Sequence, residues 1–419
     1  MNLSVTPGVT LARLPSSVSV RAWLATMLLT VVVVTSLMSA VTMTGAIVAD
    51  DAGTTPKLYH AALAIVGAVV LFRGRIARPR SELLLYFGVT IGVSLLAYAF
   101  HEPRVAVVKS IIALGVALIA ASIGRFAGPA IVLRACRIGS VMFLVAVTAK
   151  NAGNVPAFLA FLFSPLGHPD VPSLAGGGLN LEATWLALSA VFLIGTTLFV
   201  PYVLAAAATS ALYASRAGVV IAFMAVVGAV LHAWGGRRLR RMDDTSVPPA
   251  RLSRRVATTL IAVAALVSIG LGTAIVRQQG EVGYVAKRFA TIGGEPGSLG
   301  RLTLWEGGLL VFAENPFGVG AGNAVPTLRR VLGVDVPEDN LHNIYLQHAV
   351  ETGIPGLLVL LILAVTVARR TIAGRFRDQL LLFVGAYLVA GAIQFTGVDA
   401  ILWLVYGMQS GLSGATGNE

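Results

Sequence analysis

Long apolar runs, separated by short basic clusters, dominate the chain and predict membrane-spanning helices. A helix needs roughly 20 apolar residues to cross a bilayer, with about 17 to 25 tolerated. By this criterion the sequence predicts an all-α, polytopic membrane protein of about twelve spans. The predicted spans are 23–48, 58–72, 82–100, 105–123, a fifth that reaches residue 148, 181–199, 202–214, 219–234, 256–276, 354–368, 380–395 and 400–412.

Arginine clusters between the apolar runs predict the orientation of the chain. They occupy residues 73–80, 125–137, 237–255 and 369–377, always at the same end of the predicted bundle. Because cytoplasmic loops carry an excess of Lys and Arg, this end is predicted to be cytoplasmic, together with both termini. The first apolar run exceeds the roughly 7 to 15 residues of a signal-peptide core, which predicts an uncleaved span.

The composition excludes a soluble globular protein. Hydrophobic residues make up 56% of the chain and charged residues 12%. A net charge of +12 would suggest nucleic-acid binding in a soluble protein. Here the arginines lie between apolar runs, and no basic face interleaved with aromatic residues is present, which argues against a nucleic-acid partner. The single cysteine, Cys136, has no partner for an internal disulfide and is interpreted as a small packing residue.

The longest stretch of mixed polarity, residues 297–361, lies after the predicted ninth span. It predicts a large extracytoplasmic subdomain at residues 277–353 between spans nine and ten, within a single transmembrane domain over residues 1–419. Ser298 is predicted to cap a helix that continues through Glu306 and Leu310. The outer loop at 150–182 is rich in Pro, Gly and Asn, and could be a connector or take part in function.

Two of the arginines outside the basic clusters, Arg216 and Arg301, are candidates for anion binding. A charge near the bilayer core costs free energy, so an arginine among apolar helices suggests a function. Arg216 lies in a short outer turn between two apolar runs, and Arg301 is expected to share a helix face with Trp305 four residues later. Each could instead be a surface arginine, with Arg216 extending its side chain to the interface.

His342 is the histidine with the densest polar surroundings. It stands in a His-Asn-x-Tyr pattern, after the turn-forming residues 337–340 and before a predicted helix. Imidazole titrates near pKa 6.5, so it can accept a proton from a hydroxyl group at physiological pH. A lone histidine is more often structural, and this is the interpretation for His348.

Two weaker signals remain open. The glycines of residues 315–323 would suit a loop that cradles phosphate, and would equally suit an ordinary turn-rich loop. Asp50 and Asp51, in the first outer loop, could hold a divalent metal, but no second acidic cluster is near them in sequence. The chain contains no Gly-Lys-Ser or Gly-Lys-Thr of a nucleotide-binding loop.

The polar motifs together resemble the signature of the O-antigen ligase and polymerase superfamily of membrane glycosyltransferases. The resemblance rests on Gly-Arg-x-x-x-Trp at 300–305, Asn-Pro-Phe-Gly-Val-Gly at 315–320, His-Asn-x-Tyr-Leu at 342–346 and Glu-x-Gly-Ile-Pro-Gly-Leu at 351–357. Ser-Arg followed by small residues at 215–218 also resembles a motif of this superfamily. The usable motifs extend from about residue 183 to 361, and the first five spans are similar in hydropathy alone.

The resemblance implies transfer of a saccharide from a polyprenyl-pyrophosphate carrier to an acceptor hydroxyl on the outer face of the membrane, with inversion and without a metal or cofactor. The acceptor could be a glycan, a glycolipid or a protein. Arg216 and Arg301 would bind the pyrophosphate and His342 would act as the base. Trp305, Asn343 and Tyr345 would support them.

Three alternatives stay open on the sequence. A repeat-unit polymerase would differ from a ligase in its acceptor. A metal-dependent membrane glycosyltransferase would use Asp50 and Asp51. A transporter would show charges in the middle of its helices or broken helices in matched halves, whereas the predicted spans are nearly free of charge apart from Lys109.

Overall fold

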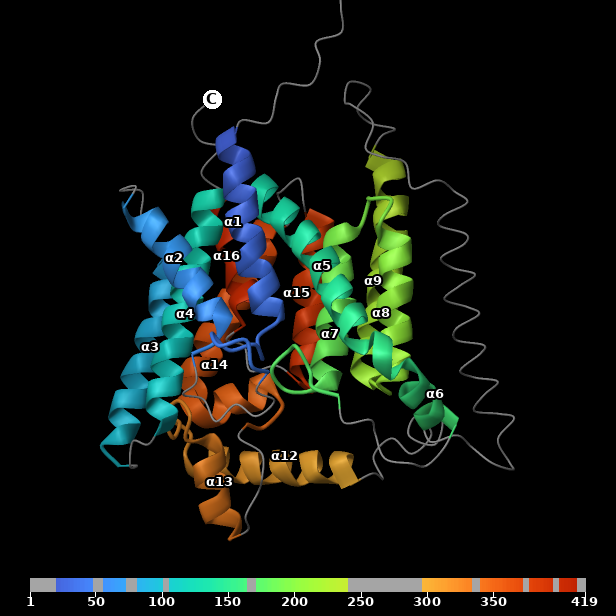
Figure 1. Ribbon diagram of the computed structural model, residues 1–419. Coiled ribbons are helices and arrows are strands. Elements are labelled where there is room, and N and C mark those ends of the chain that lie inside the picture. Colours follow the sequence, from blue (N-terminus) through green and yellow to red (C-terminus); the bar gives the residue numbers. More distant parts are fainter. Residues whose placement is uncertain are drawn as a thin grey trace, which may run out of the picture.

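A computed structural model describes residues 20–47, 56–72, 81–100, 105–163, 171–239, 296–333, 340–371, 377–394 and 399–412 (Figure 1). Within these ranges the regular structure is helical, with two isolated β-bridges. The helices are α1 (Val20–Leu37), α2 (Leu58–Phe72), α3 (Ser81–Tyr98), α4 (Val105–Ala127), α5 (Pro129–Asn151), η1 (Ala152–Asn154), α6 (Val155–Phe163), α7 (Leu179–Ser189), η2 (Ala190–Leu193), α8 (Phe199–Leu212), α9 (Arg216–Leu239), α12 (Pro296–Glu314), α13 (Ala324–Leu332), α14 (Ile344–Thr371), α15 (Arg377–Gly391) and α16 (Ala400–Leu412).

The chain is a multi-pass membrane protein of apolar helices, as the sequence predicts. Five stretches are long and apolar enough to cross a membrane, and further apolar helices of 10–17 residues fill the remaining predicted spans in the described part of the chain. The predicted ninth span at 256–276 lies outside the described residues. The total of about twelve spans therefore stays a prediction. The five long stretches are Val20–Leu37, Ser81–Tyr98, Pro129–Ala160, Arg216–Ala233 and Ile344–Thr366.

Two predicted boundaries are wrong, and one predicted loop contains a helix. The first span ends at Leu37 instead of residue 48. The chain then turns, with an isolated β-bridge between Val41 and Ile47 and a 2.9 Å bond from Thr42 Oγ1 to the carbonyl oxygen of Ala46. The inner turn before α8 lies at residues 194–198, and Pro201 falls in the first helical turn, where its missing N–H costs nothing. The outer loop at 150–182 contains a short apolar helix, α6.

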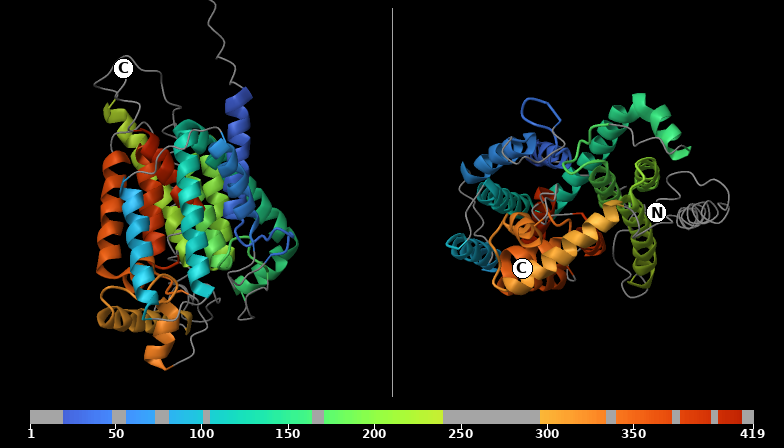
Figure 2. Two further views of the ribbon diagram at one scale, coloured as in Figure 1. Left: turned by 90° about the vertical axis from the view of Figure 1, so that its left-hand side faces the viewer. Right: turned by 90° about the horizontal axis from the view of Figure 1, so that it is seen from below.

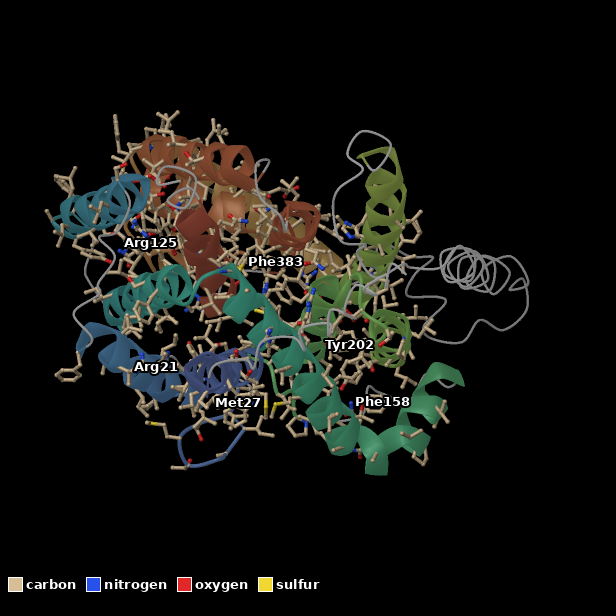
Figure 3. The ribbon with its side chains drawn as sticks, turned by 90° about the horizontal axis from the view of Figure 1, so that it is seen from above. Arg21, Met27, Arg125, Phe158, Tyr202 and Phe383 are labelled. Carbon is tan, nitrogen blue, oxygen red and sulfur yellow. The ribbon has the colours of Figure 1, made fainter. Side chains whose placement is uncertain are left out.

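The helices stand side by side, with α12 and α13 gathered at one end of the bundle (Figures 1 and 2). The start of α1 and the basic end of α4 lie at the opposite end, and Figure 3 looks onto that end, with Arg21 and Arg125 labelled. This arrangement agrees with the predicted separation of arginine clusters from the polar motifs. We call the end that carries α12 and α13 the motif end.

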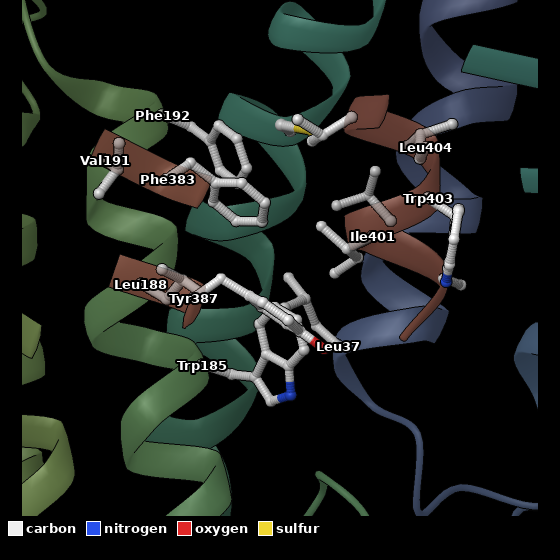
Figure 4. Packing of buried hydrophobic residues seen from close by; sticks show 14 of the residues in the cluster. Leu37, Trp185, Leu188, Val191, Phe192, Phe383, Tyr387, Ile401, Trp403 and Leu404 are labelled. Atoms are coloured by element: carbon white, nitrogen blue, oxygen red, sulfur yellow. The ribbon is translucent and has the colours of Figure 1, made fainter. Parts of the chain in front are cut away.

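Buried side chains from α1, α5, α7, α15 and α16 form the centre of the bundle (Figure 4). Phe192 and Phe383 pack with their ring centroids 4.8 Å apart, and Trp185 lies 6.2 Å from Tyr387. Helices α4 and α16 approach so closely that a Cβ on Gly124 would lie 2.1 Å from the carbonyl oxygen of Leu404. Small residues at such a crossing permit close backbone packing between membrane helices.

A second apolar cluster lies at the motif end, separate from the centre of the bundle. Its members come from α12, α13, the start of α14 and the loops between them, and Trp305 packs against it. These elements therefore have a hydrophobic core of their own, which fixes the polar motifs relative to one another. The buried members are Leu304, Val311, Val319, Ala324, Val325, Leu328, Leu341, Leu346 and Val350.

Candidate functional site

His342 lies in a loop held by two asparagine side chains just before α14. The backbone N–H of His342 donates to Asn340 Oδ1 at 2.8 Å. Asn343 Oδ1 accepts from the N–H groups of Tyr345 and Leu346, both at 3.0 Å, and so caps the helix. His342 has a φ of 50°, a left-handed conformation that is uncommon outside glycine. The predicted position of His342, directly before a helix, is confirmed.

Trp305 connects α12 to the loop of His342. Its indole Nε1 donates to the carbonyl oxygen of Leu341 at 2.9 Å, and the N–H of Leu341 donates to Gln347 Oε1 at 2.9 Å. The residue before His342 is therefore bonded on both sides of its backbone. Arg301 is half-buried and lies one turn before Trp305 on the same helix. This helix begins at Pro296, two residues before the predicted cap Ser298.

The start of α14 is also tied to the end of α15. Tyr345 OH donates to the carbonyl oxygen of Leu388 at 3.0 Å, and a Cβ on Gly391 would lie 3.3 Å from Ile344. Just after α15, Gln394 Oε1 accepts a hydrogen bond of 2.6 Å from Thr184 Oγ1 on α7. These contacts join the histidine loop to the helices that hold Arg216.

Arg216 is the first residue of α9 and is half-buried. The preceding Ser215 is completely buried, and its Oγ accepts from the N–H of Gly218 at 3.2 Å, which caps the helix. The same hydroxyl donates to the carbonyl oxygen of Asn180 on α7 at 3.3 Å. The turn that presents Arg216 is therefore anchored to the first turn of α7.

The structure brings all six predicted site residues to the motif end. Trp305 is in direct contact with the histidine loop, whereas Arg216 is connected to it through α7 and α15. Helix α12, which carries Arg301, runs from α13 and α14 toward the ends of α7, α8 and α9 (Figures 1 and 2). Two arginines and a histidine of the predicted site thus lie at the same end of the bundle.

The glycine-rich loop at 315–323 is a structural clamp. The N–H groups of Val319 and Gly320 each donate at 2.9 Å to α14, to the carbonyl oxygens of Val350 and Glu351. The N–H of Gly322 donates to Glu351 Oε1 at 2.9 Å, and that of Ala321 to Ser94 Oγ at 3.0 Å. Because these donors are engaged within the protein, the interpretation as a phosphate cradle is wrong.

Other candidates from the sequence take different places. His348 stacks on Tyr86, with ring centroids 5.4 Å apart and an angle of 3° between the planes, and Cys136 is completely buried. Both positions agree with structural roles. Asp50, Asp51 and residues 337–339 lie outside the described residues. In the described ranges, no three His, Cys, Asp or Glu residues form a group able to hold a metal ion.

A buried polar cluster that the sequence did not predict lies beside the turn of Arg216. Lys150 and Glu182, interpreted as the limits of an outer loop, belong to the end of α5 and the start of α7. Lys150 Nζ lies 2.6 Å from Glu182 Oε1, and Tyr213 OH donates to the same oxygen at 2.6 Å. The available signal was an acidic residue in the first turn of an apolar helix, where an ionisable group suggests function.

Residues 201–361 match the family model described as O-antigen ligase. The matched region begins in α8 and ends within α14, so it includes Arg216, Arg301 and His342. No curated protein matches the chain.

Proposed function

We propose, from the match of residues 201–361 to the O-antigen ligase family model, that this chain transfers a saccharide from a polyprenyl-pyrophosphate carrier to an acceptor hydroxyl. The family supports a glycosyltransferase type of activity in a membrane protein. The donor, the acceptor hydroxyl of a glycan, glycolipid or protein, and the location on the outer face of the membrane are parts of our proposal.

One observation carries this proposal. The two arginines and the histidine lie in the matched region and come to the same end of the bundle, although long apolar segments separate Arg216 from Arg301 and His342 in the sequence. A lipid-linked pyrophosphate needs cationic side chains near the membrane surface, and an acceptor hydroxyl needs a base beside it. The motif end supplies both kinds of group.

The arginines would stabilise the leaving group. Pyrophosphate leaves readily, so the reaction needs stabilisation of the developing negative charge more than a proton donor. A guanidinium group can bind phosphate oxygens through two charge-assisted hydrogen bonds. Arg216 and Arg301 would bind the pyrophosphate in this way, and we expect no metal or cofactor to take part.

His342 would act as the general base. Its imidazole takes the proton from the acceptor hydroxyl as the hydroxyl oxygen bonds to the anomeric carbon. The bond from that carbon to the pyrophosphate oxygen breaks, and its electron pair stays on the pyrophosphate. Attack from the side opposite the leaving group inverts the anomeric centre. The left-handed backbone at His342, fixed by Asn340, would hold the imidazole in place.

Three neighbouring residues would support this chemistry. Asn343 caps α14, Tyr345 bonds to α15, and Trp305 bonds to the residue before His342. Each of these bonds limits movement of the histidine loop relative to a different helix. We assign them positioning roles because their polar atoms bond to the protein backbone.

The test is transfer of a glycan from a polyprenyl-pyrophosphate donor by the purified protein. General-base catalysis is worth roughly 10² to 10⁴ in rate, so His342→Ala should lower transfer by that factor while expression is retained. His232→Ala, on the same family domain but farther along α9, is the matched control and should keep the rate. Activity should persist in EDTA and in the Asp50→Ala, Asp51→Ala double variant. Suppose instead that EDTA abolished transfer, that magnesium or manganese restored it, and that the double variant was inactive. The chemistry would then be placed at the first outer loop.

A deletion strain separates a ligase from a polymerase. Loss of a ligase should leave full-length polymer on the carrier lipid, whereas loss of a polymerase should leave single repeat units there. Mass analysis of the extracted carrier-linked glycans measures this. No change in carrier-linked glycans would contradict both forms of the proposal.

A further inference from the structure

Glu182 is a completely buried carboxylate with four hydrogen-bond donors at the motif end. Lys150 Nζ and Tyr213 OH reach Oε1, each at 2.6 Å. Ser173 Oγ reaches Oε2 at 3.3 Å, and the N–H of Leu174 donates to the same oxygen. The first turn of α7 thus bonds to α5, to the turn after α8 and to the segment that precedes α7.

Stability alone does not account for such a cluster. Removing two charges from water is costly, and replacing a buried ion pair by apolar residues is often neutral or stabilising. A buried pair is better explained where it fixes the arrangement of neighbouring elements, which is its best-attested use. The question is therefore which element the Glu182 cluster fixes.

The fixed element is the turn that presents Arg216. Tyr213, Ala214 and Ser215 connect α8 to α9, and Ala214 has a left-handed φ of 51°. The turn is attached to the start of α7 at two points, through Tyr213 OH to Glu182 and through Ser215 Oγ to the carbonyl oxygen of Asn180. Arg216 follows the second point directly.

Tyr213 is suited to a permanent donor role. It is 1% exposed, and burial raises the pKa of its phenol, with the Glu182 carboxylate raising that pKa further. The hydroxyl therefore keeps its proton at physiological pH and donates to Glu182. Asn151 Nδ2 donates to the same hydroxyl oxygen, which fixes the phenol from the side of α5.

We propose that Glu182, acting through Tyr213, is a positioning residue that holds the Arg216 guanidinium toward its anion. This proposal rests on the proposed function, since it assigns Arg216 a substrate pyrophosphate. Lys150 balances the charge of the Glu182 carboxylate. The cluster sets the position of Arg216 without touching the substrate.

The position of the turn can be measured without the reaction. Arg216→Cys in a Cys136→Ser background gives one thiol, whose rate of modification by a small water-soluble reagent reports how far the turn opens. Adding Tyr213→Phe should raise this rate roughly two- to tenfold, the effect of one lost hydrogen bond on a local opening equilibrium. Glu182→Gln, which keeps the side-chain shape, should act in the same direction.

Tyr406→Phe is the matched control. Tyr406 is also buried and its hydroxyl donates to a largely buried carboxylate, Glu82 at 3.0 Å, but this pair lies between α3 and α16 away from Arg216. Adding Tyr406→Phe should leave the modification rate at position 216 unchanged. Equal rates for the Tyr213 and Tyr406 variants would overturn the proposal and reduce the Glu182 cluster to a structural contact.

The rate of glycan transfer then tests whether the position of Arg216 affects the reaction. With Arg216 intact, Tyr213→Phe should lower the transfer rate by roughly ten- to a hundredfold, as small displacements of a binding group can. In an Arg216→Lys background the same change should have little further effect, because both act on one interaction. If Tyr213→Phe lowered the transfer rate by the same factor in the Arg216→Lys background as in the wild type, the proposal would be overturned. A wild-type protein without transfer activity would contradict the proposed function, while the modification rates would still decide the positioning role.

Discussion

The indole nitrogen of Trp305 donates a hydrogen bond of 2.9 Å to the carbonyl oxygen of Leu341, the residue that precedes His342. This bond crosses from the middle of α12 to the loop before α14. It connects the helix that carries Arg301 to the histidine. Two motifs that are separate in the sequence therefore form one unit in the structure.

The first prediction concerns this bond. Trp305→Phe keeps an aromatic ring in the apolar cluster and removes the donor. A net hydrogen bond is worth about 0.5 to 1.5 kcal/mol, so transfer should fall roughly two- to tenfold as the histidine loop loosens. Trp23→Phe is the control, because Trp23 is 54% exposed on α1, far from the motif end. Equal rates for both variants would show that the indole bond does not position His342.

Much of the fold could be predicted from hydropathy alone. Backbone polar groups must be satisfied within the membrane, so long apolar runs become helices, and the helices that are described follow the predicted spans closely. The misplaced boundaries depend on local chemistry that hydropathy does not record. The chain turns after Leu37, where Thr42 bonds to the carbonyl oxygen of Ala46, and Pro201 is accepted in the first turn of α8.

The candidate site was predicted as residues but not as contacts. The motifs identify Arg216, Arg301 and His342, yet nothing in their spacing indicates that Trp305 bonds to the histidine loop or that α7 anchors Arg216. The cluster of Lys150, Glu182 and Tyr213 was not predicted because its members come from two helices and from the turn after a third, far apart in the sequence. A long-range ion pair leaves no periodic pattern in one sequence.

The second prediction separates anion binding from surface roles at the arginines. Lysine keeps the charge but loses the planar fork that binds two phosphate oxygens. Arg216→Lys and Arg301→Lys should therefore each lower transfer at least about tenfold, equivalent to ~1.4 kcal/mol. Arg330→Lys is the control, since Arg330 is exposed on α13 at the same end of the bundle. Near-full activity in both test variants would support arginines that merely extend to the membrane interface.

The third prediction concerns the break in α14. Gly353 has φ 65° and ψ −162°, a combination essentially restricted to glycine, and a Cβ there would lie 2.4 Å from the carbonyl oxygen of Pro316. Gly353→Ala should therefore destabilise the protein by roughly 1 to 3 kcal/mol and lower its midpoint of thermal inactivation in detergent. Gly385→Ala is the control, because a Cβ at that helical position meets nothing within 4 Å. An unchanged midpoint for Gly353→Ala would show that the clamp does not need this backbone conformation.

The last prediction is that the motif end faces the outside of the membrane. Arg216 and His342 lie at this end, so sites near them should share one compartment, and the basic end should face the cytoplasm. Single cysteines in a Cys136→Ser background test this with a membrane-impermeant thiol reagent on intact cells. The expected outer sites are Ser215, Leu332 and His342, and the expected inner sites are Arg238 and Arg375, the latter outside the described residues.

Because Ser215 is buried, Ala211→Cys, which is exposed one turn earlier on α8, is the better reporter for that turn. Ala211→Cys and Leu332→Cys should react with the impermeant reagent in intact cells. Arg238→Cys should react only after the cells are permeabilised. If Leu332→Cys reacted only in permeabilised cells while Ala211→Cys reacted in intact ones, Arg216 and the elements around His342 would lie on opposite sides of the membrane. No single pyrophosphate could then contact both arginines, and the proposed reaction would be untenable.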